Sequence, residues 1–182
     1  MAGTLNNICV FCGASAGNGH EHAKAARVLG RTMADRGLGL VYGAGNVGLM
    51  GELADSALSA GGRVAGVIPE RLMNRELAHQ DITELYVVST MHERKAKMHD
   101  LCDAYIALPG GIGTMEEFFE AVTWRQLGYH NKPIALLNVD GFYDGIESFF
   151  ATMQQGGFLH SNHRELFFIE TTPEMLLNRL AG

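Results

Sequence analysis

Short β-branched or aliphatic runs alternate along this chain with amphipathic stretches that are long enough to form helices. Several of the short runs are apolar throughout, which is typical of strands that are covered on both faces of a sheet. Strand, helix and strand repeated in this order imply a parallel sheet with right-handed crossover connections. We therefore expect an α/β fold, a Rossmann-like three-layer sandwich with a mostly parallel sheet of about seven strands, in which ligands bind at the carboxyl ends of the strands.

The same pattern predicts the individual elements. The strands are expected at Asn7–Cys12, Leu38–Tyr42, Arg63–Ile68, Glu84–Val88, Ala104–Leu108, Pro133–Asn138 and Leu166–Ile169. The helices are expected at Glu21–Arg36, Met50–Ala60, Met91–Leu101, Met115–Leu127, Tyr143–Gln155 and Pro173–Leu180. Gly37 and Gly61 stand where helix C-terminal caps belong, and Thr172 precedes a proline at a helix start. No shift in composition divides the chain, so we expect residues 1–182 to form a single domain.

Composition excludes several classes of protein. With 182 residues, 47% of them hydrophobic, the chain can bury a substantial core. Its formal net charge of −6 gives no support for long-range attraction to nucleic acid or to an anionic membrane. No apolar run reaches the ~18 residues of a membrane span. The first basic residue is Lys24, so we expect no signal peptide and a soluble, cytoplasmic protein.

The cysteines and histidines do not form a recognisable metal site. Cys9 and Cys12 have no second pair of cysteines to complete a structural zinc site, and three cysteines cannot build a disulfide framework. His92 and Glu93 lack the further histidine of a zinc protease, because Ala96 stands at that position. We therefore expect buried free thiols and no bound metal.

Two glycine-rich turns follow the first two predicted strands. Gly13–Gly17 matches the G-x-S-x-G pattern of a hydrolase nucleophile elbow, although such elbows do not normally follow the opening strand. The alternative is that Ser15 offers a hydroxyl and a backbone N–H to an anion. Gly43–Gly48 matches the G-x-G-x-x-G dinucleotide fingerprint, but its acidic partner, Glu70, comes later than expected. Tight packing of a helix on the sheet is therefore the alternative to NAD binding at this turn.

A third turn, Pro109–Glu117, has the features of a phosphate-binding loop. Its three glycines let the backbone turn N–H groups toward one point. Thr114 adds a hydroxyl, and the helix that follows contributes the positive end of its dipole. The alternative needs no ligand, because Thr114 and Glu117 are also spaced as a helix capping box.

Two cations fall on the face of the Met91–Leu101 helix that should be buried. On a helical wheel Arg94 and Lys95 lie within the apolar stripe, whereas Lys97 lies to one side. Burying unpaired charge costs several kcal/mol, so these two cations need an anionic partner or a wet cleft. The alternative is that their side chains extend past a partly buried surface into solvent.

The Met115–Leu127 helix carries a matching carboxylate. Glu117 shares a second apolar stripe with Trp124, whereas Glu116 lies on the polar side, so Glu117 is expected to be the less solvated of the two. The stripe continues toward Tyr129 and exceeds what one sheet face covers. Because exposed stripes of this kind usually mark interfaces, we expect it to contribute to a homodimer contact.

These residues resemble the LOG (Lonely Guy) family of cytokinin riboside 5′-monophosphate phosphoribohydrolases, older members of which were labelled lysine decarboxylases. The family's Pro-Gly-Gly-x-Gly-Thr-x-x-Glu motif is complete from Pro109 to Glu117, and its Met-His-x-Arg-Lys motif is complete from Met91 to Lys95. Further similar segments are Cys12–Ser15, Tyr42–Gly51 and the pair Arg75-Glu76. The resemblance spans nearly the whole chain.

The resemblance implies a nucleotide-binding enzyme that hydrolyses the N-glycosidic bond of adenosine 5′-monophosphate, N6-substituted or plain, to the free base and ribose 5-phosphate. It implies catalytic roles for Arg94 and Glu117, and a phosphate site from Gly111 to Thr114. The implied substrate-binding residues are Glu76, Lys95, Gly111, Ile112, Gly113, Thr114, Met115, Glu116 and Thr123, with further loop contacts expected at Ser15 and Gly45. The family also implies a homodimer and requires no metal or organic cofactor.

One position departs from the family pattern. Ala44 stands where the family commonly has a glycine, and the additional methyl is expected to narrow that turn.

Two other functions stay open as alternatives. One is a non-catalytic carrier similar to the molybdenum-cofactor carriers, whose fold is like that of this family, although intact Arg94 and Glu117 favour the enzyme. The other, less favoured, is an NAD-binding oxidoreductase that uses Gly43–Gly48.

Overall fold

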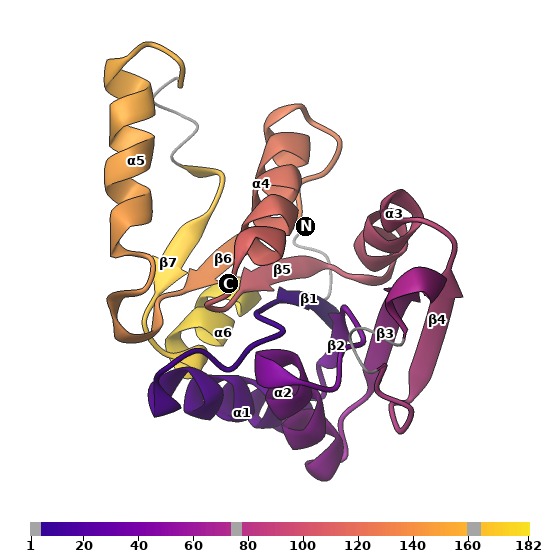
Figure 1. Ribbon diagram of the computed structural model, residues 1–182. Helices are drawn as coiled ribbons and strands as arrows, with labels where there is room; N and C mark the ends of the chain where they lie inside the picture. The colour runs from indigo at the N-terminus through magenta and orange to yellow at the C-terminus, as the bar shows by residue number, and fades with distance from the viewer. Residues whose placement is uncertain (1–4, 74–77, 160–164) are drawn as a thin grey trace.

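The computed structural model describes residues 5–73, 78–159 and 165–182 of the chain. Within these ranges the seven strands form one sheet that is parallel throughout, in the order β4-β3-β2-β1-β5-β6-β7 (Figure 1). The strands are β1 (Asn7–Phe11), β2 (Gly39–Tyr42), β3 (Val64–Pro69), β4 (Glu84–Val88), β5 (Ala104–Ala107), β6 (Ile134–Leu137) and β7 (Phe168–Glu170). The predicted α/β class is confirmed.

Helices cover both faces of this sheet. They are α1 (His20–Asp35), α2 (Gly48–Ser59), α3 (Met91–Leu101), α4 (Ile112–Gln126), α5 (Asp144–Gln155) and α6 (Pro173–Ala181), with 3₁₀ turns η1 (Glu70–Leu72) and η2 (Val139–Gly141). α1, α2 and α6 pack on one face, and α3, α4 and α5 pack on the other (Figure 1), which gives the predicted three layers. None of the helices in the described ranges is long and apolar enough to cross a bilayer.

The predicted bounds agree with the structure to within two residues at every end except one. Helix α4 begins at Ile112, three residues before its predicted start at Met115. The predicted caps are confirmed. Gly37 and Gly61 follow α1 and α2 with φ angles of 71° and 78°. The hydroxyl of Thr172 accepts a hydrogen bond at the start of α6.

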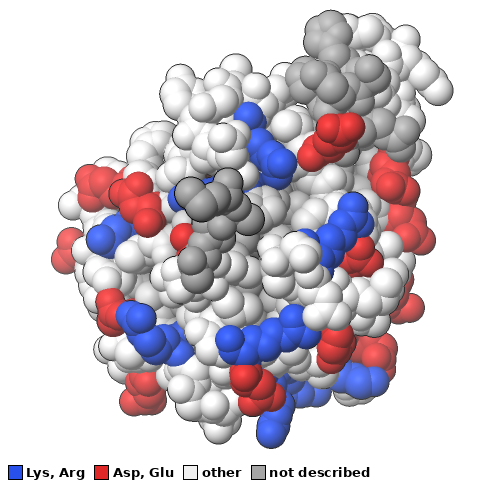
Figure 2. Space-filling view, turned by 180° about the vertical axis from the view of Figure 1, so that it is seen from behind, with Lys and Arg blue, Asp and Glu red and all other residues white. Residues whose placement is uncertain are grey.

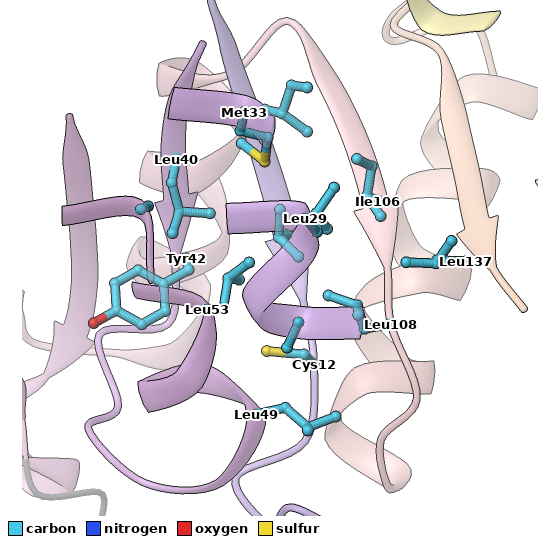
Figure 3. Packing of buried hydrophobic residues seen from close by; sticks show 14 of the residues in the cluster. Cys12, Leu29, Met33, Leu40, Tyr42, Leu49, Leu53, Ile106, Leu108 and Leu137 are labelled. Carbon is cyan, nitrogen blue, oxygen red and sulfur yellow. The ribbon is translucent and has the colours of Figure 1, made fainter. Parts of the chain in front are cut away.

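The core beneath α1 and α2 gives the strand ends a rigid support. Figure 3 shows Leu29 and Met33 of α1 and Leu53 of α2 packed over Leu40 of β2 and Ile106 of β5. Each of these five side chains is at most 1% exposed. Burial of a side chain of this size contributes roughly 1.5–3 kcal/mol to folding. The turns that leave the strands therefore start from a well-packed base.

The three glycine-rich turns meet because the strand order reverses at β1, which lies between β2 and β5. The N–H of Gly13 donates to the carbonyl of Pro109 at 3.1 Å, and the N–H of Leu49 donates to the carbonyl of Gly13 at 3.0 Å. The turns after β1, β2 and β5 thus form one surface at the carboxyl edge of the sheet. This switch point is where α/β folds of this kind bind their ligands.

Charge is mixed over the face seen in Figure 2. Lysine and arginine side chains alternate there with aspartate and glutamate side chains. Among the described residues of that face, the basic side chains form no continuous surface of the kind that binds phosphate backbones.

Candidate active site

A cavity of about 310 Å³ opens where the three turns meet. All three turns and the helices α3 and α4 contribute to its walls. The charged side chains that border it are Arg94, Glu116 and Glu117, the glycines include Gly43, Gly111 and Gly113, and the apolar side chains include Met50, Leu72 and Met91. The structure therefore brings the predicted phosphate turn and both predicted catalytic residues into one cavity.

The phosphate turn is built into the start of α4. Because Gly111 is the N-cap, Thr114 lies inside the first helical turn, and the capping-box alternative is wrong. Thr114 is buried against Gly110, where a Cβ would lie 2.1 Å from the threonine Oγ1. Gly111 and Gly113 border the cavity, and a Cβ on either would meet nothing within 4 Å. The backbone at the positive end of α4 is therefore open to an approaching anion.

Arg94 is buried where α3 meets the ends of β2 and β3. Its Nε donates to the carbonyl of Val67 at 3.1 Å, and its Nη2 donates to the carbonyl of Gly43 at 2.9 Å. A Cβ on Gly43 would lie 2.1 Å from Nη2, so glycine leaves the room that the guanidinium occupies. The residue is 6% exposed, so the predicted burial is confirmed and extension into solvent is wrong for Arg94.

The carboxylates of α4 divide as predicted. Glu117 is half-buried and Glu116 is exposed, although both border the cavity.

The Cys12 thiol also borders the cavity. Its pKa is raised, mainly by burial and to a smaller extent by the negative charge of Glu117. Cys12 therefore stays protonated near neutral pH and is a poor nucleophile. The predicted buried free thiols are confirmed for all three cysteines of the chain.

The other two cations of α3 take different positions. The ammonium of Lys97 lies 4.6 Å from the centre of the Tyr86 ring on β4. The ammonium of Lys95 contacts the carboxylates of Glu116 and Glu120, each at 2.6 Å. Burial lowers the pKa of Lys95, but its hydrogen bonds to the two carboxylates outweigh this and hold the pKa above its ordinary value. Lys95 is therefore a charged residue turned toward α4.

A second, narrow cleft lies between α3 and α4 and contains the stripe predicted for a dimer contact. Lys95, Ala121 and Trp124 border it, and Phe11 and Glu117 border both this cleft and the cavity. The Trp124 ring packs edge-on against His99 of α3 at 5.3 Å. Ala121 and Trp124 of the stripe thus face α3 of the same chain, whereas Tyr129 is 75% exposed. The sequence could not show which helix would be the neighbour of Trp124.

The remaining residues of α4 that the resemblance assigns to substrate do not border the cavity. Ile112 is 90% exposed at the helix start, and Met115 packs with the core beneath α4. Thr123 is exposed farther along the helix and does not border the cavity. The structure therefore brings Arg94, Glu117 and the phosphate turn together and leaves Thr123 apart.

The two expected loop contacts, Ser15 and Gly45, do not border the cavity. Ser15 borders a neighbouring cavity of about 700 Å³, and its Oγ accepts a hydrogen bond from the N–H of Gly17. Gly45 forms an isolated antiparallel bridge with Ala78. Glu76 lies outside the described residues.

Close packing requires glycine at two positions of the second turn, Gly43 and Gly48. Besides the contact of Gly43 with Arg94, a Cβ on Gly48 would lie 2.4 Å from the backbone of Ala14. Ala44 has a φ of 62° and is fully buried, and a Cβ on Gly66 would lie 2.6 Å from the Ala44 methyl. Ala44 does not border the cavity, because its methyl occupies the room left by Gly66. Packing, the alternative to NAD binding, accounts for Gly43 and Gly48 of this turn.

Sequence reasoning missed the groups that hold the cations. The carbonyls of Gly43 and Val67 carry no side-chain signal, and Glu120 lies on a helix face that looks solvated in the sequence. In the part of the chain that the structure describes, no three His, Cys, Asp or Glu side chains gather in a way that could hold a metal ion.

Comparisons with known proteins agree on one group. The family described as "Possible lysine decarboxylase" matches residues 50–180. Cytokinin riboside 5′-monophosphate phosphoribohydrolase LOG2 of Arabidopsis thaliana is 46% identical over 176 residues, which cover 97% of this chain and 83% of that protein. Cytokinin riboside 5′-monophosphate phosphoribohydrolase LOG of Oryza sativa subsp. japonica is also 46% identical over 176 residues, covering 97% of this chain and 73% of that protein.

Solved structures share the fold at lower identity. The molybdenum cofactor binding protein from Rippkaea orientalis has a TM-score of 0.73 at 22% identity, covering 97% of this chain and 96% of that one. The molybdenum cofactor carrier protein from Chlamydomonas reinhardtii has a TM-score of 0.71 at 21% identity, and the match covers 97% of this chain and 98% of that one. At these identities the likeness concerns the fold alone.

Two glycines that border the cavity should respond oppositely to alanine. Gly43→Ala forces the Arg94 guanidinium off its carbonyls and should lower the free energy of unfolding by about 1–3 kcal/mol, the usual cost of overpacking. Gly113→Ala has open space and should leave stability unchanged or raise it by up to about 1 kcal/mol. Urea denaturation measures both. Equal losses of unfolding free energy in the two variants would contradict the role of Gly43. The same conclusion would follow if Gly43→Ala were equally destabilising in a protein that already carries Arg94→Ala.

Proposed function

The chain belongs to the LOG family of cytokinin riboside 5′-monophosphate phosphoribohydrolases, and from that membership we propose how its cavity works. The enzyme hydrolyses the N-glycosidic bond of an adenosine 5′-monophosphate whose N6 is substituted or free, and it releases the base and ribose 5-phosphate. One observation carries the assignment to this cavity: α4 supplies both the open helix start at Gly111–Thr114 and the half-buried carboxylate of Glu117.

The spacing along α4 suits a ribose 5-phosphate group. Thr114 and Glu117 are three residues apart, about 4.5 Å along the helix axis at 1.5 Å per residue. A phosphate at the helix start would be held by backbone N–H groups and the helix dipole. The ribose attached to it then lies beside Glu117, and this fixed geometry lowers the entropic part of the barrier.

Glu117 acts where charge develops. As the bond between ribose C1′ and the base nitrogen breaks, positive charge accumulates on the sugar, as in other glycoside hydrolyses. A carboxylate beside C1′ stabilises this charge or orients the water that attacks C1′. The water oxygen ends on C1′, and a proton ends on the departing base. Hydrolysis of this kind requires no metal or organic cofactor.

Arg94 supplies a pre-organised donor on the opposite wall. Its guanidinium is fixed by the carbonyls of Gly43 and Val67 before any ligand arrives. A fixed cationic donor helps to bind the ribose or the base without reorganising during the reaction. The apolar side chains of Met50, Leu72 and Met91 border the same cavity and suit the flat base.

Cytoplasmic location and a homodimer belong to the same proposal. Exposed apolar side chains at both ends of α4 support a protein contact there: Ile112 is 90% exposed, Leu127 is 64% exposed, and Tyr129 just beyond the helix is 75% exposed. A contact through these side chains would hold α4, and with it Glu117, in place.

Glu117→Gln tests the assignment directly. The variant keeps the size of the side chain and removes its charge, so it should fold like the wild type and release base at least about 10²-fold more slowly. Chromatography of free base from AMP and from N6-isopentenyladenosine 5′-monophosphate measures this, with thermal melting as the fold control. Wild-type turnover by the folded variant would remove Glu117 from the mechanism. A wild type that binds both nucleotides and releases no base would favour the carrier.

Two cations of α3 provide a matched comparison. Arg94→Ala should lose base release by about 10²-fold or more, because the cavity loses its fixed donor. Lys97→Ala should keep nearly full activity, since that ammonium lies over Tyr86. Base release by the two variants is measured in the same assay. Similar activities would refute the view that Arg94 acts in the cavity.

The phosphate turn should make the 5′-phosphate essential. A riboside without its phosphate loses the contacts with Gly111–Thr114, so it should bind weakly and be poorly positioned. Comparing kcat/KM for a riboside and its monophosphate measures the effect, and we expect a ratio of at least about 10². Comparable values would mean that the start of α4 takes no part in substrate binding.

A further inference from the structure

An ion-pair cluster joins α3 and α4 beside the active-site cavity. The ammonium of Lys95 on α3 lies 2.6 Å from a carboxylate oxygen of Glu116 and 2.6 Å from one of Glu120, both on α4. The Lys95 side chain is 13% exposed, and that of Glu120 is 24% exposed. The Glu116 side chain is 51% exposed, so the Lys95–Glu120 pair is the more shielded of the two. Ion pairs in full solvent contribute little, whereas a shielded pair holds its geometry better.

The cluster lies directly next to the catalytic pair in the sequence. Lys95 follows Arg94 on α3, and Glu116 precedes Glu117 on α4. Consecutive residues of a helix point about 100° apart, since a turn holds 3.6 residues. A rotation or shift of either helix that broke the cluster would therefore also move Arg94 relative to Glu117.

The two helices touch differently at the two ends of the cleft between them. At the end remote from the cavity, the rings of His99 and Trp124 pack at 5.3 Å, and His99 packs on His130 at 5.1 Å. Burial lowers the pKa of His99 and lowers that of His130 to about 4, so both rings are neutral at pH 7. At the end next to the cavity, the ion-pair cluster joins the helices.

Lys95, which the family resemblance assigns to substrate binding, borders the narrow cleft and not the cavity itself. Its ammonium is turned to α4. Glu120 shares that cleft with Glu117, which lies one helical turn away on α4.

We propose that Glu120 is a positioning residue for base release, which acts through Lys95 to fix the separation of α3 and α4 and thereby the placement of Glu117 opposite Arg94. The proposal rests on the proposed function, because the effect is on the hydrolytic step. Kinetics distinguish a positioning role of Glu120 from a direct contact with substrate. A misplaced Glu117 lowers kcat, whereas a lost contact with bound substrate raises KM.

The test compares Glu120→Gln with a control on the opposite face of the sheet. Glu52→Gln breaks another ion pair between helices, that of Arg27 on α1 with Glu52 on α2 at 2.8 Å, away from the cavity. With AMP as substrate, Glu120→Gln should lower kcat about tenfold and keep KM within about threefold, because misplacement of about 1 Å costs up to 10²-fold. Glu52→Gln should keep the wild-type kcat.

A charge exchange separates positioning from simple loss of stability. Glu120→Lys alone should lower kcat by about 10²-fold, because two cations then face each other. The double variant Lys95→Glu/Glu120→Lys restores opposite charges. Its kcat should be at least about threefold higher than that of Glu120→Lys alone. Thermal melting of every variant shows that it is folded at the assay temperature.

The outcomes distinguish this inference from the function on which it rests. A wild type that releases no base overturns the proposed function itself. With an active wild type, an unchanged kcat in Glu120→Gln, a change confined to KM, or a charge exchange that recovers nothing would each overturn the positioning role of Glu120.

Discussion

The buried guanidinium of Arg94 is the constraint on which the site depends. Burying a cation is costly, and the chain offsets the cost with backbone carbonyls at the ends of two neighbouring strands, those of Gly43 and Val67. This arrangement requires β2 and β3 to be adjacent and parallel, and it requires the residue after β2 to be glycine. The glycine at position 43, the position of α3 and the cation within the apolar stripe of α3 all follow from this one placement.

Helix α4 combines several functions at its first turns. Its start forms the open backbone at Gly111 and Gly113, its third residue packs into the space left by Gly110, and its next turn brings Glu117 to the cavity. A single rigid element therefore fixes the distance between the open helix start and the Glu117 carboxylate, to which we assign the phosphate and the catalytic step in our proposal. Such pre-organisation removes the need for the site to rearrange during catalysis.

The sequence predicts most of this fold because its signals are local. Apolar runs covered on both faces give the strands, and the helical wheel places Arg94 and Glu117 on buried faces. The start of α4 was missed because glycine has a poor helix propensity, and tertiary packing of Thr114 outweighs it. The partners of Lys95 and the neighbour of Trp124 could not be predicted, because they depend on how far apart two helices lie on the sheet.

The strand order also governs when the site can form during synthesis. The central strand β1 pairs with β5, where Ile8 lies opposite Ala104, and the cavity needs residues as far along the chain as Glu117. A chain that emerges from its N-terminus therefore exposes one edge of β1 until well over half of it has been made. Pairing across so long a separation is slow, and an unpaired strand edge favours aggregation. The arrangement that gathers three turns into one cavity thus makes the nascent protein dependent on completing β5 and α4 quickly.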